Sequence, residues 1–72
     1  MKTYHTLYDV QQLLKNYGSV VYVGKRLWDI EMMAIEIDSL YRAQVLDLKT
    51  YQIVKGVLLR EHEEELKKEQ TK

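Results

Sequence analysis

The chain has 72 residues, with 11 basic and 11 acidic side chains, no cysteine and no proline. A chain of this length has room for one domain, which buries only about 60% of the surface that the unfolded chain exposes. Without cysteine, neither a disulfide nor a thiolate zinc site can support the core. Close helix packing and self-association are the remaining ways to stabilise so small a domain. We therefore predict one small domain over residues 1–72, in a reducing compartment.

The apolar segments are short and the charges are balanced. The longest apolar runs, residues 20–23 and 32–35, have four residues each, whereas a membrane-spanning helix needs about 20. The N-terminal segment lacks the apolar core and the cleavage site of a signal peptide. Residues 1–42 carry five charges of each sign and residues 43–72 carry six, which gives no general excess for coating nucleic acid or anionic lipid. We expect a cytoplasmic protein that does not associate with membranes.

The first predicted helix covers about residues 7–17. Its apolar residues recur at three- and four-residue intervals and therefore share one face. They are Leu7, Val10, Leu13, Leu14 and Tyr17. Thr6 and Asp9 have the spacing of a capping box, with aspartate in place of glutamate or glutamine. Gly18 is suited to end the helix because glycine adopts a positive φ at little cost.

The next segment, SVVYVG, is predicted to be an extended connector. It has the β-branched content of a strand, but the chain offers no second strand with which it could pair. We expect its valines to cover the open end of a helical bundle. Gly24 is expected to turn the chain into the second helix.

The second predicted helix covers about residues 27–43. One stripe of residues, all apolar except the last, follows a 3.6-residue period and, in a strand, would be divided between both faces. The stripe consists of Ile30, Met33, Ala34, Ile37, Leu40, Tyr41 and Gln44. Asp29 and Glu31 near its start and Arg42 near its end agree in sign with the helix dipole.

The third predicted helix begins after Asp47, whose side chain is placed to cap free backbone N–H groups. Leu46 precedes the cap and is expected to pack on Tyr51 as a hydrophobic staple. The predicted buried stripe is Leu48, Tyr51, Val54 and Leu58, broadened by Ile53 and Val57. Gly56 weakens the helix by up to about 1 kcal/mol relative to alanine, unless a neighbouring helix needs the close approach.

These patterns together predict an all-α fold. It is a small three-helix bundle with a short first helix and an extended connector between the first and second helices. We expect the ordered bundle over about residues 4–60 and a charged, solvated helical extension over residues 61–72. Leu13, Ile37 and Leu58, one from each helix, are expected to be buried together.

No pattern of residues indicates catalysis or metal binding. His5 and His62 lie in opposite terminal segments without the spacing of metal ligands, and we interpret both as surface residues. Gly18 and Gly24 match neither of the glycine-rich phosphate-binding motifs, GxxxxGK[ST] and GxGxxG. The carboxylates are explained as caps and exposed helix positions. We therefore predict a protein that is not an enzyme, with no catalytic residues, no metal and no cofactor.

Aromatic and basic residues gather around the connector. They are Lys15, Tyr17, Tyr22, Lys25, Arg26 and Trp28, six residues within fourteen positions. Sites that bind single-stranded nucleic acid combine basic side chains, which contact the phosphates, with aromatic rings, which stack on the bases. The structural alternative, which we favour, is that the three rings cover a small core while the three cations solvate its rim.

Several ordered motifs carry a resemblance to a known family. LYDVQQLLKNYG at residues 7–18, Y.G.R..DIEMM at residues 22–33 and LY at residues 40–41 resemble the YqgQ-like family of small bacterial proteins. The match covers about residues 4–60, and it implies a bundle of three helices in which the first is the shortest. No function is established for that family, so the resemblance assigns no catalytic or binding residues. Lys25 stands where the family pattern suggests an acidic residue, which makes the residues around the connector more basic than in the family. The tail after Arg60 lies outside the match.

We interpret the chain as a non-enzymatic interaction module that presents the connector and the start of the second helix to a macromolecular partner. Six tyrosines, three methionines and one tryptophan exceed what so small an interior can hide. We therefore expect a second copy of the chain as a partner, in a homodimer. Binding of single-stranded nucleic acid by the same six residues is the alternative.

Overall fold

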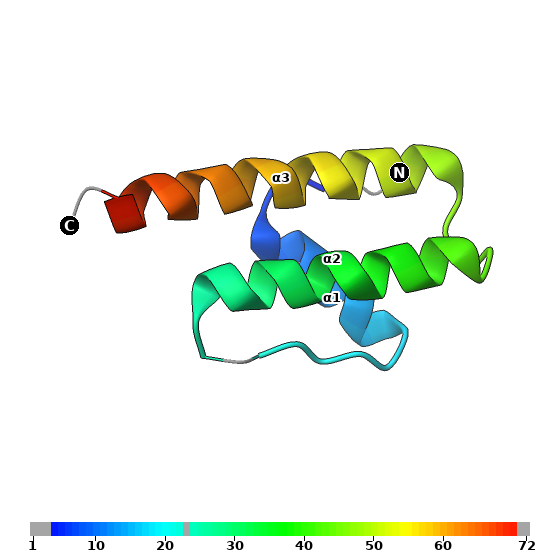
Figure 1. Cartoon of the computed structure of the whole chain (residues 1–72). Helices are drawn as coiled ribbons and strands as arrows, with labels where there is room; N and C mark the ends of the chain where they lie inside the picture. The colour runs from blue at the N-terminus through cyan, green and yellow to red at the C-terminus, as the bar shows by residue number, and fades with distance from the viewer. Residues whose placement is uncertain (1–3, 23, 71–72) are drawn as a thin grey trace.

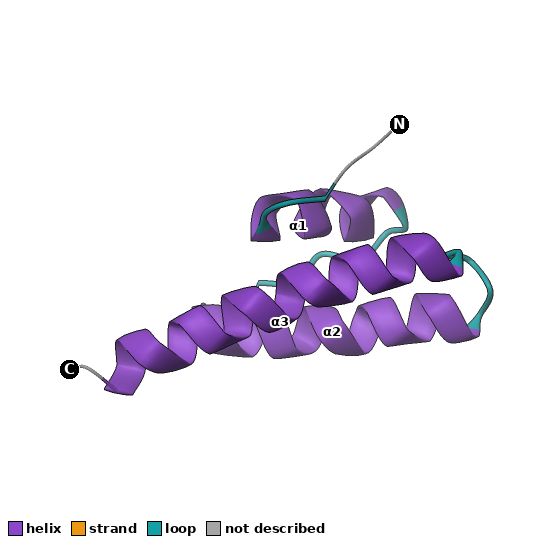
Figure 2. Cartoon of the chain, turned by 90° about the horizontal axis from the view of Figure 1, so that it is seen from above, coloured by secondary structure: helices purple, strands orange, loops and turns teal. Residues whose placement is uncertain are grey.

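The structure is a computed structural model that describes residues 4–22 and 24–70, with side chains through residue 68. It contains α1 (Leu7–Asn16), α2 (Arg26–Arg42) and α3 (Leu48–Gln70), and the described residues form no strand. α2 and α3 run antiparallel, side by side, and α3 extends beyond α2 at its C-terminal end (Figure 1). The shorter α1 packs on one side of this pair (Figure 2). The predicted all-α three-helix bundle is confirmed.

The ends of α1 follow the predicted capping residues. The N–H of Asp9 donates to Thr6 Oγ1 at 3.3 Å, and the N–H of Thr6 donates to Asp9 Oδ2 at 3.2 Å. The backbone N–H of His5, and then that of Thr6, hold the pKa of the Asp9 carboxyl below its ordinary value because they stabilise its charged form. Gly18 has a φ of +82° and donates to the Lys15 carbonyl at 3.0 Å. The capping box and the glycine at the helix end are both confirmed.

α2 begins and ends one residue earlier than predicted. Gly24, with a φ of +100°, turns the chain into the helix ahead of its N-cap, Lys25. At the other end Gln44 has a φ of +63° and donates to the Tyr41 carbonyl at 3.0 Å. The left-handed residue after the helix satisfies carbonyls of the last turn. Gln44 therefore lies outside the helix and does not extend its apolar stripe as predicted.

α3 begins after the predicted cap and continues as one helix through the charged segment to Gln70. The N–H of Thr50 donates to Asp47 Oδ2 at 3.3 Å. Leu46 is buried, and Tyr51 packs against the same core. No helix of the described residues is long and apolar enough to cross a membrane.

One hydrophobic core joins the three helices. Leu13, Ile37 and Leu58 are buried in it together, as predicted. The remaining buried members are Leu7, Val10, Leu14, Ile30, Met33, Leu46, Val54 and Val57. Because aliphatic side chains fill this interior, it holds few aromatic rings.

Three residues predicted to be buried on helix faces are exposed. Tyr17 is the C-cap of α1 and no longer has helical dihedral angles, so it leaves the buried face. Leu48 is 54% exposed, whereas Leu46, two residues earlier, is buried. Ile53 lies beside the buried stripe of α3 and is also exposed.

The connector covers less of the core than predicted. Val20 is 79% exposed, whereas Val21 is partly buried and packs against the core. Val23 lies outside the described residues. Ser19 Oγ donates to Glu36 Oε2 at 3.3 Å, which ties the start of the connector to α2.

Candidate functional site

The six aromatic and basic residues singled out in the sequence are all exposed. They lie on α1 and its C-cap, in the connector, and at the start of α2: Lys15, Tyr17, Tyr22, Lys25, Arg26 and Trp28. Tyr22, for example, is 80% exposed. The interpretation that the three rings cover the core is therefore wrong, because aliphatic side chains already fill that space.

Arg26 forms two ion pairs with α3. Its Nη2 atom lies 3.2 Å from Glu61 Oε1, and its Nε atom lies 3.6 Å from Glu65 Oε2. Both glutamates belong to α3, so the Arg26 guanidinium links the N-terminal end of α2 to α3. Its charge is balanced within the chain.

Four of the other five residues form two smaller groups, and the fifth, Tyr17, is the C-cap of α1. Lys25 Nζ lies 5.1 Å from the centroid of the Trp28 ring, within the range of a cation–π interaction. Lys15 and Tyr22 line a hollow of about 370 Å³ between α1 and the connector. The structure thus distributes the six residues over separate places and does not gather them in one binding surface.

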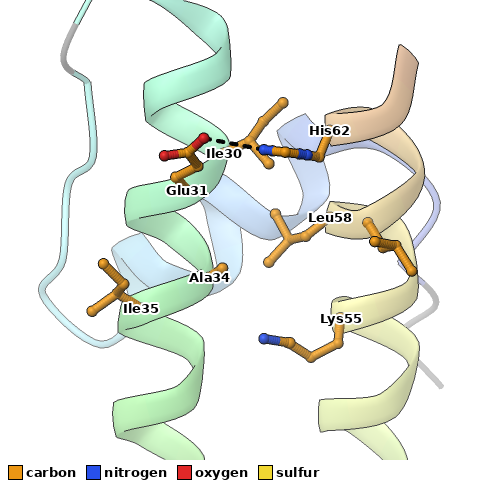
Figure 3. A pocket seen from close by; sticks show the side chains of 8 residues that line it. Ile30, Glu31, Ala34, Ile35, Lys55, Leu58 and His62 are labelled. Atoms are coloured by element: carbon orange, nitrogen blue, oxygen red, sulfur yellow. Dashed lines mark hydrogen bonds and ion pairs between the residues drawn. The ribbon is translucent and has the colours of Figure 1, made fainter. Parts of the chain in front are cut away.

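A groove runs between α2 and α3 on the side that α1 leaves uncovered (Figure 3). Its volume is about 350 Å³. In Figure 3, α1 lies behind the two helices, and side chains from both helices line the groove. The lining residues are Ile30, Glu31, Ala34, Ile35, Lys55, Leu58, Leu59 and His62. The two helices therefore have one side packed on α1 and another open to solvent.

Exposed apolar side chains flank this groove. Ile35 on α2 is 55% exposed and Leu59 on α3 is 62% exposed. A second hollow on α2 adds Trp28 and Met32 and shares Ile35 with the groove. We call the combined surface the α2–α3 face, formed by Trp28, Glu31, Met32, Ile35, Lys55, Leu59 and His62.

Polar contacts cross between the helices above and below the apolar middle of the groove. His62 Nε2 lies 3.1 Å from Glu31 Oε2, as Figure 3 shows at one end. Toward the other end, Lys55 Nζ donates to Asp38 Oδ1 at 3.0 Å. At both positions the carboxylate comes from α2 and the basic side chain from α3.

Asp38 also accepts a hydrogen bond from the Tyr51 hydroxyl at 2.7 Å. This bond, and then the Lys55 ammonium, hold the pKa of Asp38 below its ordinary value because they stabilise the carboxylate. The carboxylate in turn raises the pKa of Tyr51. The Tyr51 ring stacks on Tyr41 with centroids 4.1 Å apart, which fixes the hydroxyl beside Asp38.

Of the α2–α3 face, only Trp28 was singled out in the sequence, although the spacing on α2 gives a signal for two more of its residues. Trp28, Met32 and Ile35 recur at intervals of four and three residues, which places a second apolar stripe on α2. His62 faces Glu31 on another helix and not its neighbours on α3. Within the described residues, no group of three or more histidine, aspartate or glutamate side chains is arranged to hold a metal ion.

Comparison with known proteins places the chain in a family. A family model described as YqgQ-like matches residues 1–64. The chain belongs to the YqgQ-like family. It is 40% identical over 60 residues to a Bacillus subtilis (strain 168) protein named Uncharacterized protein YqgQ, and this match covers 83% of the chain and 84% of that protein. The resemblance seen in the motifs is confirmed, and the YqgQ-like match includes every residue of the α2–α3 face.

Proposed function

We propose that this protein is a non-enzymatic interaction module that binds a protein partner on its α2–α3 face. The exposure of Ile35 and Leu59 on the two sides of an apolar groove carries this proposal. Removing apolar surface from water is favourable by about 25 cal/mol per Å². A contiguous apolar patch rimmed by polar groups is typical of surfaces that partners cover.

The shape and composition of the face favour a protein over a small ligand. The groove continues into the hollow beside Trp28 and Met32, so the apolar surface follows the N-terminal half of α2. Tryptophan and methionine are enriched where protein surfaces are buried by partners. Helices bind such grooves through apolar residues spaced three and four apart.

A capture experiment with matched variants tests the location of the binding surface. The tagged chain, an Ile35→Glu and Leu59→Glu variant, and a Val20→Glu and Tyr22→Glu variant are compared in extracts of the native cell, with nuclease present. We expect a specific protein to bind the parent and the connector variant but not the groove variant. Retention by the groove variant together with loss from the connector variant would contradict the proposal.

A second candidate function is the binding of single-stranded nucleic acid at the connector. The exposed ring of Tyr22 and the cation of Lys15, which line one hollow, support it. A ring that is open to solvent can stack on a base, worth about 1 to 3 kcal/mol. Arg26 is paired with Glu61 and Glu65, so Lys15 is the cation expected to contact phosphate.

Titration with fluorescent oligonucleotides at low salt tests this second candidate. Tyr22→Ala is expected to weaken binding by loss of stacking, and Lys15→Gln to weaken it and flatten its salt dependence. Arg26→Gln serves as the control, with a smaller effect. Absence of binding near 100 µM, about the weak end of non-specific affinities, would eliminate this function.

A further inference from the structure

We infer that the partner on the α2–α3 face is a second copy of this chain, related by a two-fold axis that runs parallel to α2 and α3. This inference rests on the proposed function, because it uses the same face, and it adds the identity and the orientation of the partner. The order of charges along the groove carries it.

Three layers of side chains lie along the helix axes at the groove, and Asp38 joins the last of them through Lys55, which lines the groove. Glu31 and His62 form one end layer, at 3.1 Å from each other, and Asp38 and Lys55 form the other, at 3.0 Å. The apolar layer between them contains Ala34, Ile35, Leu58 and Leu59. In both end layers α2 supplies the acid and α3 supplies the base.

Two copies that meet face to face must have their two-fold axis within the interface plane. If the axis is parallel to the helices, each layer meets the same layer of the other copy, and α2 lies over the partner's α3. Glu31 then faces the partner's His62, and Asp38 faces the partner's Lys55. Each carboxylate then faces a basic side chain of the other copy, and the apolar layers coincide.

An axis within the same plane but perpendicular to the helices gives the reverse arrangement of charges. The two end layers then exchange places, and α2 lies over the partner's α2. Glu31 faces the partner's Asp38, and His62 faces the partner's Lys55. Like charges across an interface disfavour association, so charge complementarity selects the parallel axis.

The apolar residues of the face are suited to the parallel arrangement. Ile35 and Leu59 meet in the central layer, and the other copy covers Trp28 and Met32 at the edge of α2. The paired α2 and α3 helices of both copies would form a four-helix arrangement with α1 on each outer side. Each copy would bury the side of the helix pair that α1 leaves open.

Sedimentation equilibrium of the full chain tests both the dimer and its orientation. The parent is expected to change from 8.6 kDa toward twice that mass as its concentration rises through the micromolar range. Glu31→Lys removes the carboxylate that faces the partner's His62, and His62→Glu places a second carboxylate opposite the partner's Glu31. Each variant should weaken dimerisation by about tenfold. An equimolar mixture of the two variants should recover the parent affinity, since the new lysine of one variant then faces the new glutamate of the other.

The control is Glu64→Lys, which makes the same change of charge as Glu31→Lys. Residue 64 lies about 200° around the axis of α3 from His62, so this variant should leave dimerisation unchanged. Circular dichroism confirms folding of each variant; Glu31 is 53% exposed, so its replacement should be tolerated. Tighter dimerisation of Glu31→Lys would overturn the parallel axis. A monomeric parent at high micromolar concentration would overturn the dimer, whereas the proposed function fails only if the capture experiment also shows no dependence on Ile35 and Leu59.

Discussion

The Tyr51 hydroxyl donates to Asp38 Oδ1 at 2.7 Å and joins α3 to α2 at one end of the groove. Lys55 Nζ donates to the same oxygen at 3.0 Å, so one carboxylate oxygen accepts two hydrogen bonds from α3. Tyr41 stacks on Tyr51 and limits the movement of its ring. This contact orders the antiparallel pair of helices whose open side forms the α2–α3 face.

Acid is expected to destabilise the protein partly through Asp38. Its pKa is lower in the folded chain than the value of about 3.9 in an unfolded chain. The unfolded state therefore binds a proton first as the pH falls, and the stability that Asp38 contributes above that pH is lost as the pH passes through its folded pKa.

The measurement is the free energy of unfolding of the parent and of Asp38→Asn from pH 7 to pH 2. Asp38→Asn is expected to be the less stable protein at pH 7, and the difference should shrink below about pH 4. Tyr51→Phe removes the hydrogen bond that lowers the pKa of Asp38 most. Like Asp38→Asn, it should reduce the loss of stability between pH 7 and pH 2. A difference that stays constant over this range would contradict the assignment.

Two neighbouring leucines on α3 should respond in opposite ways to truncation. Leu58 is buried in the core and Leu59 is exposed beside the groove. Leu58→Ala, like Ile37→Ala, should cost about 2 to 5 kcal/mol, enough to unfold much of so small a domain. Leu59→Ala should change the free energy of unfolding of the monomer by about 0.5 kcal/mol or less.

Thermal denaturation followed by circular dichroism at low concentration measures both effects. If Ile37→Ala melted like the parent, the packing of α2 on the other helices would be wrong. If Leu59→Ala were as harmful as Leu58→Ala, the α2–α3 face would be part of the core.

The ends of α1 could be predicted from the sequence because capping is local. Thr6 with Asp9, and Gly18, act within one turn of α1, so neighbouring residues are enough to identify them. The buried stripe of Ile30, Met33 and Ile37 could be predicted as well, since its period is that of a helix.

The open face could not be predicted because α2 has two apolar stripes. The short α1 covers only one side of the α2–α3 pair, and nothing in the spacing of Trp28, Met32 and Ile35 shows which stripe it leaves open. For a related reason, the two tyrosines and the tryptophan near the connector were predicted to cover the core but are exposed. Aromatic composition favours burial, but the aliphatic residues of three helices already fill this small core.

Gln44 is expected to reduce stability through its backbone conformation. Its φ of +63° lies in the left-handed region, which costs a residue with a Cβ about 1 kcal/mol or more. Gln44→Gly should therefore stabilise the protein by several tenths of a kcal/mol, after the greater flexibility of glycine in the unfolded chain is subtracted. Urea denaturation measures the change. Gln44→Ala keeps the Cβ, and an equal gain in that variant would contradict this explanation.

Gly56 is expected to reduce stability for another reason. It lies within α3, and a Cβ at this position would meet no heavy atom of the described neighbouring segments within 4 Å. Glycine inside a helix is less favourable than alanine by about 0.8 to 1 kcal/mol. Gly56→Ala should therefore raise the melting temperature of the monomer by about 4 to 8 °C. An unchanged or lower melting temperature would show that another helix approaches residue 56 closely.

The most direct test of the α2–α3 face is methyl NMR of the full chain as its binding surface becomes occupied. The spectra are recorded as the chain is concentrated, and again during titration with any protein recovered by capture. We expect the signals of Ile35 and Leu59 to shift or broaden in at least one of the two series, while those of Val20 in the connector and Leu13 in the core stay constant. Shifts confined to Val20 and its neighbours, with Ile35 and Leu59 unchanged, would contradict the assignment of this face as the binding surface.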